Sequence, residues 1–360
     1  MTATISLMVT PTRLDSNEEG PPQFYVLRGD VWRDVPLAAT IGKPSEVKGN
    51  IEVVLNTIMG QLGEGPGMGP LPALKAKFAQ IWSKFVPERV QRELADLPRS
   101  DDDPPCLMLY LHPTLEWVPW ELMHDGTDFL GLRYVIARVP IVRQGPDTSV
   151  AKHAVARICT FLGEHVMDDE QVAAWDVTFD GLPLAVTVER YPQNGTHWPT
   201  ADTVTQAASA DILHITCHGG IEDKVFDSAW TLNHQGAPHL YGLAQAVVDQ
   251  MSFAAQGPLV FGNACQSAIG PAAATGLTPG LAYSFFDRGA VAFVGAFAPL
   301  SKSLALTFAT AFYKHLLSDG MSVGTALWRT KRDFEAANED DPSWLFYCLY
   351  GSPNTQFVTG

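Results

Sequence analysis

DILHITCHGG (211–220) and PLVFGNACQSA (258–268) are the two stretches that decide the fold of this chain. Each is a short apolar run that ends at a polar, reactive type of residue beside small residues. Apolar runs of this length, bounded by Gly and Pro, are typical of buried strands in a parallel sheet. In such sheets, reactive groups lie where the chain leaves the carboxyl end of a strand. The two stretches therefore predict that His218 and Cys265 lie at one edge of the same sheet.

Strands and helices alternate through residues 151–360. Besides the two strands above, we expect strands at 155–163, 184–190, 290–297 and 346–350, and helices at 200–209, 242–254, 278–288, 302–317 and 321–336. This alternation predicts an α/β fold with an open, mostly parallel sheet and helices on both faces. The polar segment QGPDTSVAK (144–152) marks the boundary with the preceding half.

The preceding half has weaker patterns. We expect strands at 4–10, 22–37, 106–112 and 132–142, and helices between residues 45 and 97. Glu121 and His124 have the spacing of a metal-ligand pair, but a di-iron site needs two such helices, so a structural role is expected. The predicted organisation has three parts: a β-element at 1–44, a first half at 45–150 and a second half at 151–360.

Charge and cysteine content exclude several classes of function. The formal net charge is −15, which argues against a nucleic-acid-binding surface, since such a surface needs a basic patch. The five cysteines are scattered and lack CxxC spacing, which fits a reducing cytoplasm better than a disulfide framework or a zinc site. No metal or other cofactor is expected.

No targeting or membrane segment is predicted. The N-terminus, MTATISLMVTPTRL, lacks the basic region and the long apolar run of a signal peptide. The most apolar segment, 289–300, is too short to span a bilayer. We therefore expect a soluble, cytoplasmic protein without a membrane partner.

His218 and Cys265 carry the predicted chemistry. A thiol becomes a nucleophile near neutral pH when a base or cation lies beside it, and a histidine meets that need. Gly219 has no Cβ, so its backbone can approach a substrate carbonyl closely, and the N–H groups of Gly219 and Cys265 would donate to the oxyanion. The structural alternative is a hydrogen-bonded histidine at a strand end and a packed thiol. The residues that follow Cys265 are small or polar, which favours an accessible sulfur.

The sequence does not select a third member of the site. Four carboxylates are candidates to orient the imidazole, although a dyad would suffice: Asp202, Asp211, Asp223 and Asp227. His214 lies on the same face of its strand as His218 and is expected to be buried and hydrogen-bonded. Serine hydrolase chemistry is disfavoured because the chain has no GxSxG turn.

The sequence resembles the CHAT domain, a caspase-like cysteine peptidase family of the caspase–separase–gingipain clan. The resemblance rests on LHITCHGG (213–220), LVFGNACQSA (259–268), GAVAFVGAFAPL (289–300) and WLFYCLYGSP (344–353), and it extends over residues 45–358. His218 and Cys265 are 47 positions apart, which is also similar to the spacing in caspases. The family implies that residues 45–150 form a degenerate, caspase-like half without its own dyad.

The resemblance also implies roles for individual residues. His218 would be the base, Cys265 the nucleophile and Gly219 a backbone oxyanion donor, with a thioester acyl-enzyme as intermediate. In several relatives of the clan, the residue two before the cysteine is acidic and holds a basic P1 side chain. Here that residue is Asn263, and the apolar Phe297 and Ala298 are expected to line the same pocket. An uncharged, apolar P1 residue is therefore expected.

The expected function is that of a cysteine endopeptidase that cuts one specific protein substrate. By family analogy, the setting would be a bacterial signalling or antiphage-defence pathway. Relatives often carry sensor repeats, and none is found here. Regulation is therefore expected from a separate protein, from self-association, or from movement of the loops at 63–70 and 219–240. The alternative is a catalytically silent caspase-like scaffold that binds partner proteins.

Overall fold

The computed structural model divides the chain into two compact units. The first unit is Met1–Pro146 with Lys331–Phe346, and the second is Asp147–Thr330 with Tyr347–Gly360. The structure describes residues 3–10, 22–28, 31–35, 49, 70–98, 100, 102–112, 115–116, 118–140, 151–163, 178–180, 186–191, 205, 207–221, 228–233, 241–242, 248, 251, 253, 257–265, 267–268, 281–337 and 341–359. The predicted division into residues 1–44, 45–150 and 151–360 stays a prediction.

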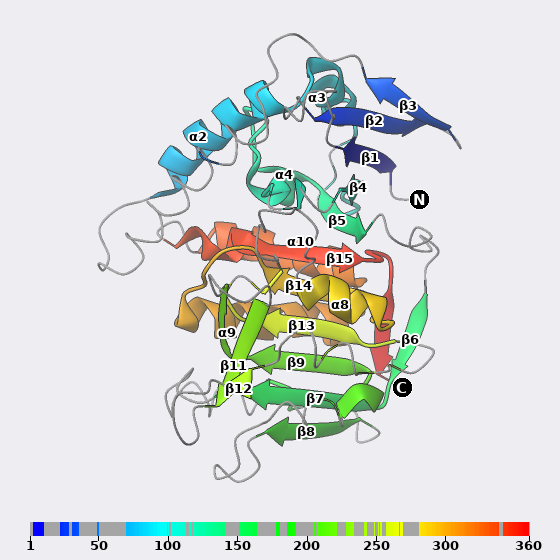
Figure 1. The fold of residues 1–360 in the computed structure, drawn as a ribbon, viewed down its shortest axis with the longest axis vertical. Coiled ribbons are helices and arrows are strands. Elements are labelled where there is room, and N and C mark those ends of the chain that lie inside the picture. Colours follow the sequence, from blue (N-terminus) through cyan, green and yellow to red (C-terminus); the bar gives the residue numbers. More distant parts are fainter. Residues whose placement is uncertain are drawn as a thin grey trace, which may run out of the picture. The chain divides into compact units, whose positions relative to one another are not determined.

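The second unit contains a mostly parallel sheet in the order β15-β14-β13-β9-β7-β8. Its strands are β7 (Arg157–Leu162), β8 (Thr187–Tyr191), β9 (Ile212–Thr216), β13 (Leu259–Asn263), β14 (Ala292–Ala296) and β15 (Tyr347–Gly351). Neighbouring strands run parallel from β8 to β14, and β15 runs antiparallel to β14 (Figure 1). The predicted α/β fold with a mostly parallel sheet is confirmed.

Helices cover both faces of this sheet. The helices are α8 (Leu281–Asp287) and α9 (Lys302–Tyr313), which continues as the π-helical turn η4 (Lys314–Ser318). The helix α10 (Val323–Glu335) follows in the chain and is divided between the two units. Phe285 of α8 packs on Phe293 of β14, with 5.8 Å between ring centroids. Phe312 of α9 packs on Phe261 of β13 at 5.1 Å. Phe261 is paired with Val294, the neighbour of Phe293, so α8 and α9 lie on opposite faces of the sheet.

Small sheets accompany the main one. β10 (His218–Ile221), β11 (Ser228–Asn233) and β12 (Tyr241–Gly242) form an antiparallel sheet, and β6 (Lys152–Val155) pairs with β16 (Gln356–Thr359). The prediction that 219–240 is a loop was therefore wrong for β10 and β11. Residues 63–69 of the predicted loop at 63–70 lie outside the described residues, and Pro70 is the first residue of a helix. Other segments of 219–240 and most of the predicted helices at 45–62, 200–209 and 242–254 also lie outside the described residues. Residues 207–209 form a 3₁₀ turn, η3.

The first unit has its own sheet, in the order β3-β2-β1-β4-β5. The strands are β1 (Thr4–Thr10), β2 (Gln23–Arg28), β3 (Val31–Val35), β4 (Cys106–Leu111) and β5 (Val135–Pro140). The expected strand at 22–37 is thus two antiparallel strands. β1 pairs in parallel with β4, so the N-terminal element belongs to the same sheet as the strands expected at 106–112 and 132–142.

Helices complete the core of the first unit: α2 (Pro70–Phe85), α3 (Glu88–Ala95), η2 (Trp120–Leu122), α4 (Leu130–Arg133) and η5 (Pro342–Phe346). Phe24, Phe85 and Trp120 meet edge to face, with centroids 6.0 to 6.5 Å apart. All three side chains are buried, and their contact joins β2, α2 and η2 in one apolar cluster.

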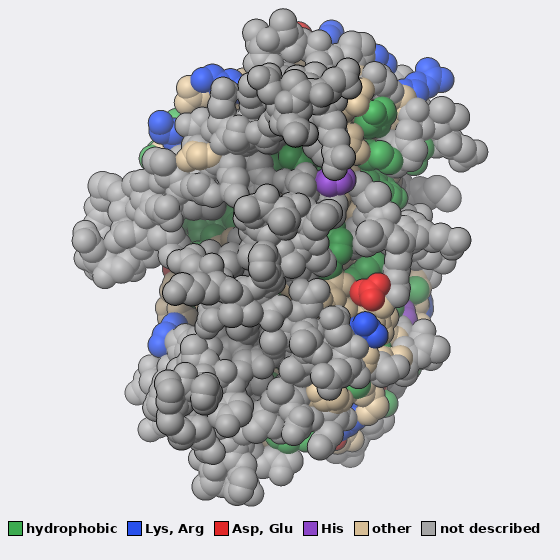
Figure 2. All heavy atoms as spheres, in the orientation of Figure 1, with side chains coloured by type: hydrophobic (Ala, Val, Ile, Leu, Met, Phe, Trp, Pro, Cys, Tyr) green, Lys and Arg blue, Asp and Glu red, His purple; other side chains and the backbone are tan. Residues whose placement is uncertain are grey.

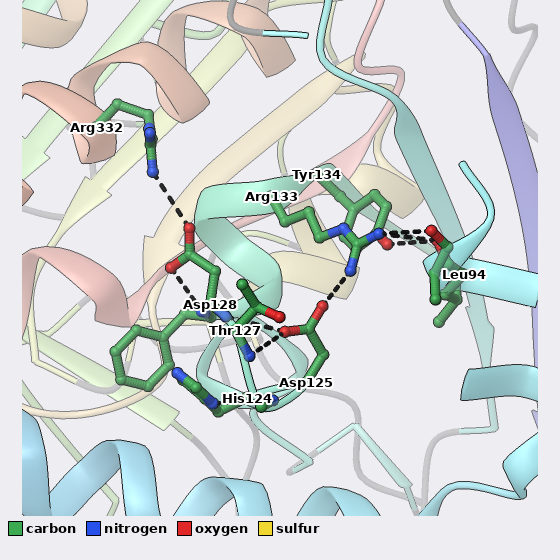
Figure 3. A network of polar contacts seen from close by, with 11 residues as sticks. Leu94, His124, Asp125, Thr127, Asp128, Arg133, Tyr134 and Arg332 are labelled. Atoms are coloured by element: carbon green, nitrogen blue, oxygen red, sulfur yellow. Dashed lines mark hydrogen bonds and ion pairs between the residues drawn. The ribbon is translucent and has the colours of Figure 1, made fainter. Parts of the chain in front are cut away.

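Ion pairs hold the segment between β4 and β5. Arg138 of β5 makes two hydrogen bonds to the Glu121 carboxylate, at 2.6 and 3.1 Å, and both side chains are buried. Asp125 accepts hydrogen bonds from the backbone of the following turn and pairs with Arg133, while Asp128 pairs with Arg332 (Figure 3). The structural role expected for Glu121 is confirmed.

His124, the second residue of the ExxH pair, also has structural contacts. Its Nδ1 accepts a hydrogen bond from the Gly126 N–H at 3.1 Å, and its ring lies edge-on to Phe129 at 5.2 Å. Burial lowers the pKa of His124. These contacts confirm the structural role expected for this histidine.

Candidate active site

The two sequence motifs leave the main sheet of the second unit at the same edge. Asn263, the last residue of β13, is paired with Thr216, the last residue of β9. All five residues of each strand are buried, because helices cover both faces of the sheet. After β9 the chain passes through Cys217 into β10, and after β13 it forms the turn that carries Cys265. The two strands lie side by side in Figure 1.

Gly219 is the point at which the two motifs touch. A Cβ placed on Gly219 would overlap the carbonyl oxygen of Cys265 and stand 3.1 Å from its carbonyl carbon and 3.2 Å from the Ala264 Cβ. Only glycine permits backbones to come this close. The backbone of His218, one residue earlier, therefore lies beside the cysteine turn. The His218 side chain lies outside the described residues, so its contact with the Cys265 sulfur stays a prediction.

Cys265 differs from the other four cysteines in its exposure. Its side chain is half-buried, whereas Cys106, Cys159, Cys217 and Cys348 are all at most 3% exposed. Burial raises the pKa of Cys106 and of Cys159 to about 12, and it raises the pKa of Cys217 well above its ordinary value. Cys265 is therefore the accessible thiol of the set.

The sulfur of Cys265 lies at the start of α9. The backbone N–H of Leu300 donates a hydrogen bond to Sγ at 3.5 Å. Leu300 precedes Ser301, the N-cap residue of the helix, by one position. Backbone N–H groups and the positive end of a helix dipole stabilise negative charge, so this environment suits a sulfur that reacts as an anion.

Ser267 braces the turn that carries Cys265. Its buried hydroxyl donates to the Gly262 carbonyl at 2.7 Å and accepts from the Ala296 N–H at 2.9 Å. The Ala268 N–H donates to the Ala296 carbonyl at 3.0 Å. These bonds tie the turn to the ends of both β13 and β14, which limits the positions that the cysteine can take.

The residues expected to contact substrate are buried. Asn263 is 3% exposed; its Oδ1 accepts from the Tyr347 hydroxyl at 2.6 Å, and its Nδ2 donates to the Ala305 carbonyl at 3.1 Å. Phe297 and Ala298 are 3% and 2% exposed. Both ends of the Asn263 amide are thus occupied within the protein. The substrate-binding role expected for Asn263, Phe297 and Ala298 stays a prediction.

His214 is the buried, hydrogen-bonded residue that was expected. It is fully buried between the Tyr313 hydroxyl, 2.9 Å from Nδ1, and the Thr216 hydroxyl, 2.8 Å from Nε2. Its ring stacks on Phe261 at 4.9 Å. Burial lowers the pKa of His214 to about 3, so the ring is neutral at physiological pH.

Asp211 accepts hydrogen bonds from the backbone N–H groups of Ala156 and Arg157, at 2.8 and 2.9 Å. Its carboxylate therefore has a structural role. The other candidates to orient the imidazole, Asp202, Asp223 and Asp227, lie outside the described residues.

Sequence reasoning missed the contacts made by Tyr347, Ala305 and the Leu300 N–H, because contacts between distant segments leave no local pattern in the chain. A role for Ser267 could have been suggested, since it is a small polar residue in the segment that directly follows the nucleophile.

The described residues give no support for a metal site, a membrane-spanning helix or, on the face shown in Figure 2, a nucleic-acid-binding surface. The part of the chain that the structure describes contains no cluster of His, Cys, Asp or Glu side chains that could hold a metal ion. Within the described ranges, no helix is both long and apolar enough to cross a bilayer. On the face shown in Figure 2, the described Lys and Arg side chains lie in separate groups and form no continuous basic patch there.

A family model and several solved structures are similar to this chain. The model of the CHAT domain matches residues 75–351. The structure of the separase–securin complex of Saccharomyces cerevisiae is similar, with a TM-score of 0.60, 10% sequence identity, and coverage of 99% of this chain and 30% of that one. This chain thus spans less than a third of the length of that separase chain. At this identity the likeness concerns the fold alone.

A second similar structure is that of the pro- and mature domains of RgpB from Porphyromonas gingivalis. Its TM-score is 0.48 at 11% identity, and the match covers 76% of this chain and 70% of that one. A related structure is described as the Arg-specific cysteine proteinase gingipain R, also with a TM-score of 0.48. No curated protein sequence matches the chain.

Proposed function

Because the chain belongs to the CHAT domain family, we propose that it is a cysteine endopeptidase with His218 as base and Cys265 as nucleophile. The observation that carries the proposal is the close approach of Gly219 to the Cys265 carbonyl, which leaves no room for a Cβ. This contact brings the backbone next to His218 against the cysteine turn. The fold is that of the caspase-like cysteine peptidases, which supports the same reaction.

The proposed reaction proceeds in two stages. His218 takes the proton of the Cys265 thiol, the sulfur attacks the carbonyl carbon of the substrate, and the N–H groups of Gly219 and Cys265 donate to the oxyanion. The C–N bond then breaks, the leaving amine takes a proton from His218, and a thioester remains on Cys265. His218 next removes a proton from water, which attacks the thioester and releases the carboxylic acid and the free thiol.

The Leu300 N–H supports the first stage. It lies 3.5 Å from the sulfur and stabilises negative charge there before the attack. The half-buried position of Cys265 lets a peptide reach the sulfur, while the other described thiols are closed off. No metal or organic cofactor is required by this chemistry.

The proposed substrate is one specific protein, cut after an uncharged, apolar P1 residue, in the cytoplasm of a bacterium with a signalling or antiphage-defence pathway. Regulation is proposed to come from a protein partner or from self-association. The separase of the similar structure is in complex with securin, which is a precedent for a protein partner on this fold. The competing function is a silent scaffold that binds partners through the same fold.

Cleavage of a proteome-derived peptide library, analysed by mass spectrometry, tests the proposal. We expect the native protein to cut peptides, with or without extract of its source organism, and the Cys265→Ala and His218→Ala variants to be inactive. Cys106→Ala is the matched control, because Cys106 is a buried thiol of the first unit. If Cys265→Ala retains the biological effect of the native protein, the scaffold function replaces the peptidase.

A further inference from the structure

Asn263 stands two residues before Cys265 and has both ends of its amide occupied inside the protein. Its Oδ1 accepts from the Tyr347 hydroxyl of β15 at 2.6 Å, and its Nδ2 donates to the Ala305 carbonyl of α9 at 3.1 Å. Tyr347 is fully buried and Asn263 nearly so. A buried amide that loses one of these partners keeps the cost of its desolvation, so each bond restrains the side chain strongly.

Tyr347 reaches Asn263 across the strand between them. β14 lies between β13 and β15, and the residue of β14 paired with Tyr347 is Ala296. Alanine leaves room for the tyrosine ring to pass over it. The ring of Tyr347 also stacks on Phe308 of α9, with centroids 4.1 Å apart and planes 4° from parallel. The hydroxyl that fixes Asn263 is therefore itself fixed by α9.

The same helix begins at the cysteine sulfur. The Leu300 N–H, which donates to Sγ of Cys265, precedes the Ala305 carbonyl by five positions on the segment that enters α9. Asn263 thus links the chain two residues before the nucleophile to the helix whose first residues meet the nucleophile itself. A change in the distance between Asn263 and Ala305 would move the sulfur relative to the Leu300 donor.

We propose that Asn263 is a positioning residue: it holds the Cys265 turn against α9 so that the Leu300 N–H reaches the sulfur. Tyr347 holds Asn263 in that position. Asn263 does not contact substrate, so the P1 preference is set by other residues. The effect on turnover rests on the proposed peptidase function, whereas the effect on the reactivity of the thiol does not.

Tyr347→Phe and Tyr134→Phe form a matched pair for the test. Each parent tyrosine is buried and donates one hydrogen bond of 2.6 Å, Tyr347 to Asn263 and Tyr134 to the Leu94 carbonyl. Both variants are expected to lose similar stability in thermal unfolding. The rate at which iodoacetamide alkylates Cys265 in the native protein at pH 7 separates them.

We expect Tyr347→Phe to slow alkylation by about tenfold, the size of a lost hydrogen bond to a charged group, and Tyr134→Phe to leave the rate unchanged. An unchanged or faster rate in Tyr347→Phe, or an equal loss in both variants, would overturn the proposal. Alkylation needs no peptidase activity. Absence of peptide cleavage would therefore refute the proposed function without touching this inference.

A second pair of variants acts on the donor itself and avoids the core. Leu300→Pro removes the N–H that meets the sulfur, and Ser301→Pro places proline at a neighbouring residue whose φ of −69° suits it. Leu300→Pro should slow alkylation as Tyr347→Phe does, while Ser301→Pro should not. If alkylation of the Leu300→Pro variant keeps the native rate, the donor has no effect on the sulfur and the proposal fails.

The P1 preference gives a third readout if peptides are cut. Asn263→Asp should lower kcat, because an acceptor replaces the donor that faces the Ala305 carbonyl, and should leave the ranking of P1 residues as it is in the native protein. Acquisition of an Arg or Lys preference by Asn263→Asp would place this side chain in the substrate pocket and overturn its assignment as a positioning residue.

Discussion

Gly219 and Cys265 are in backbone contact, although 45 residues of chain lie between them. The contact leaves no space for a Cβ on Gly219, because the Cys265 carbonyl oxygen already occupies it. It is formed by the two strands β9 and β13, whose last residues are paired. The glycine that follows His218 is thus required by packing as well as by any role of its N–H group.

The first prediction concerns Gly219→Ala. The new methyl group must displace the Cys265 carbonyl, and a misplacement of about 1 Å at a reacting group can cost about 100-fold in rate. We therefore expect kcat/KM on a cleaved library peptide to fall by about that factor, while circular dichroism shows a folded protein. Gly49→Ala is the control, since a Cβ there meets none of the residues that the structure describes within 4 Å. Equal activity in the two variants would show that the contact does not position the cysteine.

The second prediction concerns the selectivity of thiol modification. Of the five cysteines, Cys265 alone is half-buried, and burial raises the pKa of Cys106, Cys159 and Cys217. Short treatment of the native protein with iodoacetamide at pH 7 should therefore add a single carbamidomethyl group, on Cys265. Intact-mass measurement and peptide mapping check this outcome. Modification of Cys217 at a comparable rate would contradict the closed environment that the structure gives it.

Local patterns in the sequence located the strand ends correctly, for a physical reason. A continuous apolar run indicates a strand that is buried on both faces of the sheet, and the polar residue after it indicates where the strand ends. The positions of β9 and β13 could therefore be predicted from sequence alone. The β10–β11 hairpin could not be placed. Gly219 and Gly220 have low strand propensity, and pairing with β11 overrides it.

The environment of Asn263 could not be predicted for a different reason. Its partner Tyr347 lies 84 residues further along the chain. Its other partner, Ala305, contributes only a backbone carbonyl, and any residue type has one, so the sequence gives no sign of this bond. Analogy with the clan suggested a substrate contact for this position. The structure shows an amide whose two ends are satisfied by residues far away in the sequence, and such contacts cannot be inferred from local sequence patterns.

The third prediction concerns the buried ion pair of the first unit. Arg138 and Glu121 are each 1% exposed, and the Arg138 guanidinium also donates to the Glu116 and Val118 carbonyls. Arg138→Met leaves the Glu121 carboxylate buried without its cation, which should lower the free energy of unfolding by about 3–5 kcal/mol. Adding Glu121→Leu to that variant should restore part of the loss, because no uncompensated charge then remains.

Urea unfolding followed by tryptophan fluorescence measures these free energies. Arg92→Ala serves as the control. The Arg92–Glu88 ion pair is exposed to solvent, so its loss should lower the free energy of unfolding by at most about 1 kcal/mol. If the double variant is less stable than Arg138→Met, the packing of the Glu121 side chain contributes more to stability than removal of its unpaired charge restores.

The last prediction is a pH dependence of stability that originates at His214. Burial lowers the pKa of this histidine from 6.5 to about 3 in the folded protein. In the unfolded chain the imidazole has its ordinary pKa, so below about pH 6.5 the unfolded state binds a proton that the folded state does not. The contribution of His214 to stability is therefore complete above that pH. It is lost as the pH falls toward 3, with a slope of up to about 1.4 kcal/mol per pH unit.

Replacement of His214 by Gln removes the titrating group and keeps a side chain that can bond to both hydroxyls, those of Tyr313 and Thr216. The variant should be less stable than the native protein at pH 7.5, where imperfect hydrogen bonds cost it free energy. The difference between the two should shrink between pH 6.5 and pH 4.5, because only the native protein carries the histidine slope. Urea unfolding at closely spaced pH values gives both curves. Parallel curves would mean that His214 takes up its proton without leaving the core, and that the pair of hydroxyls around it accommodates an imidazolium.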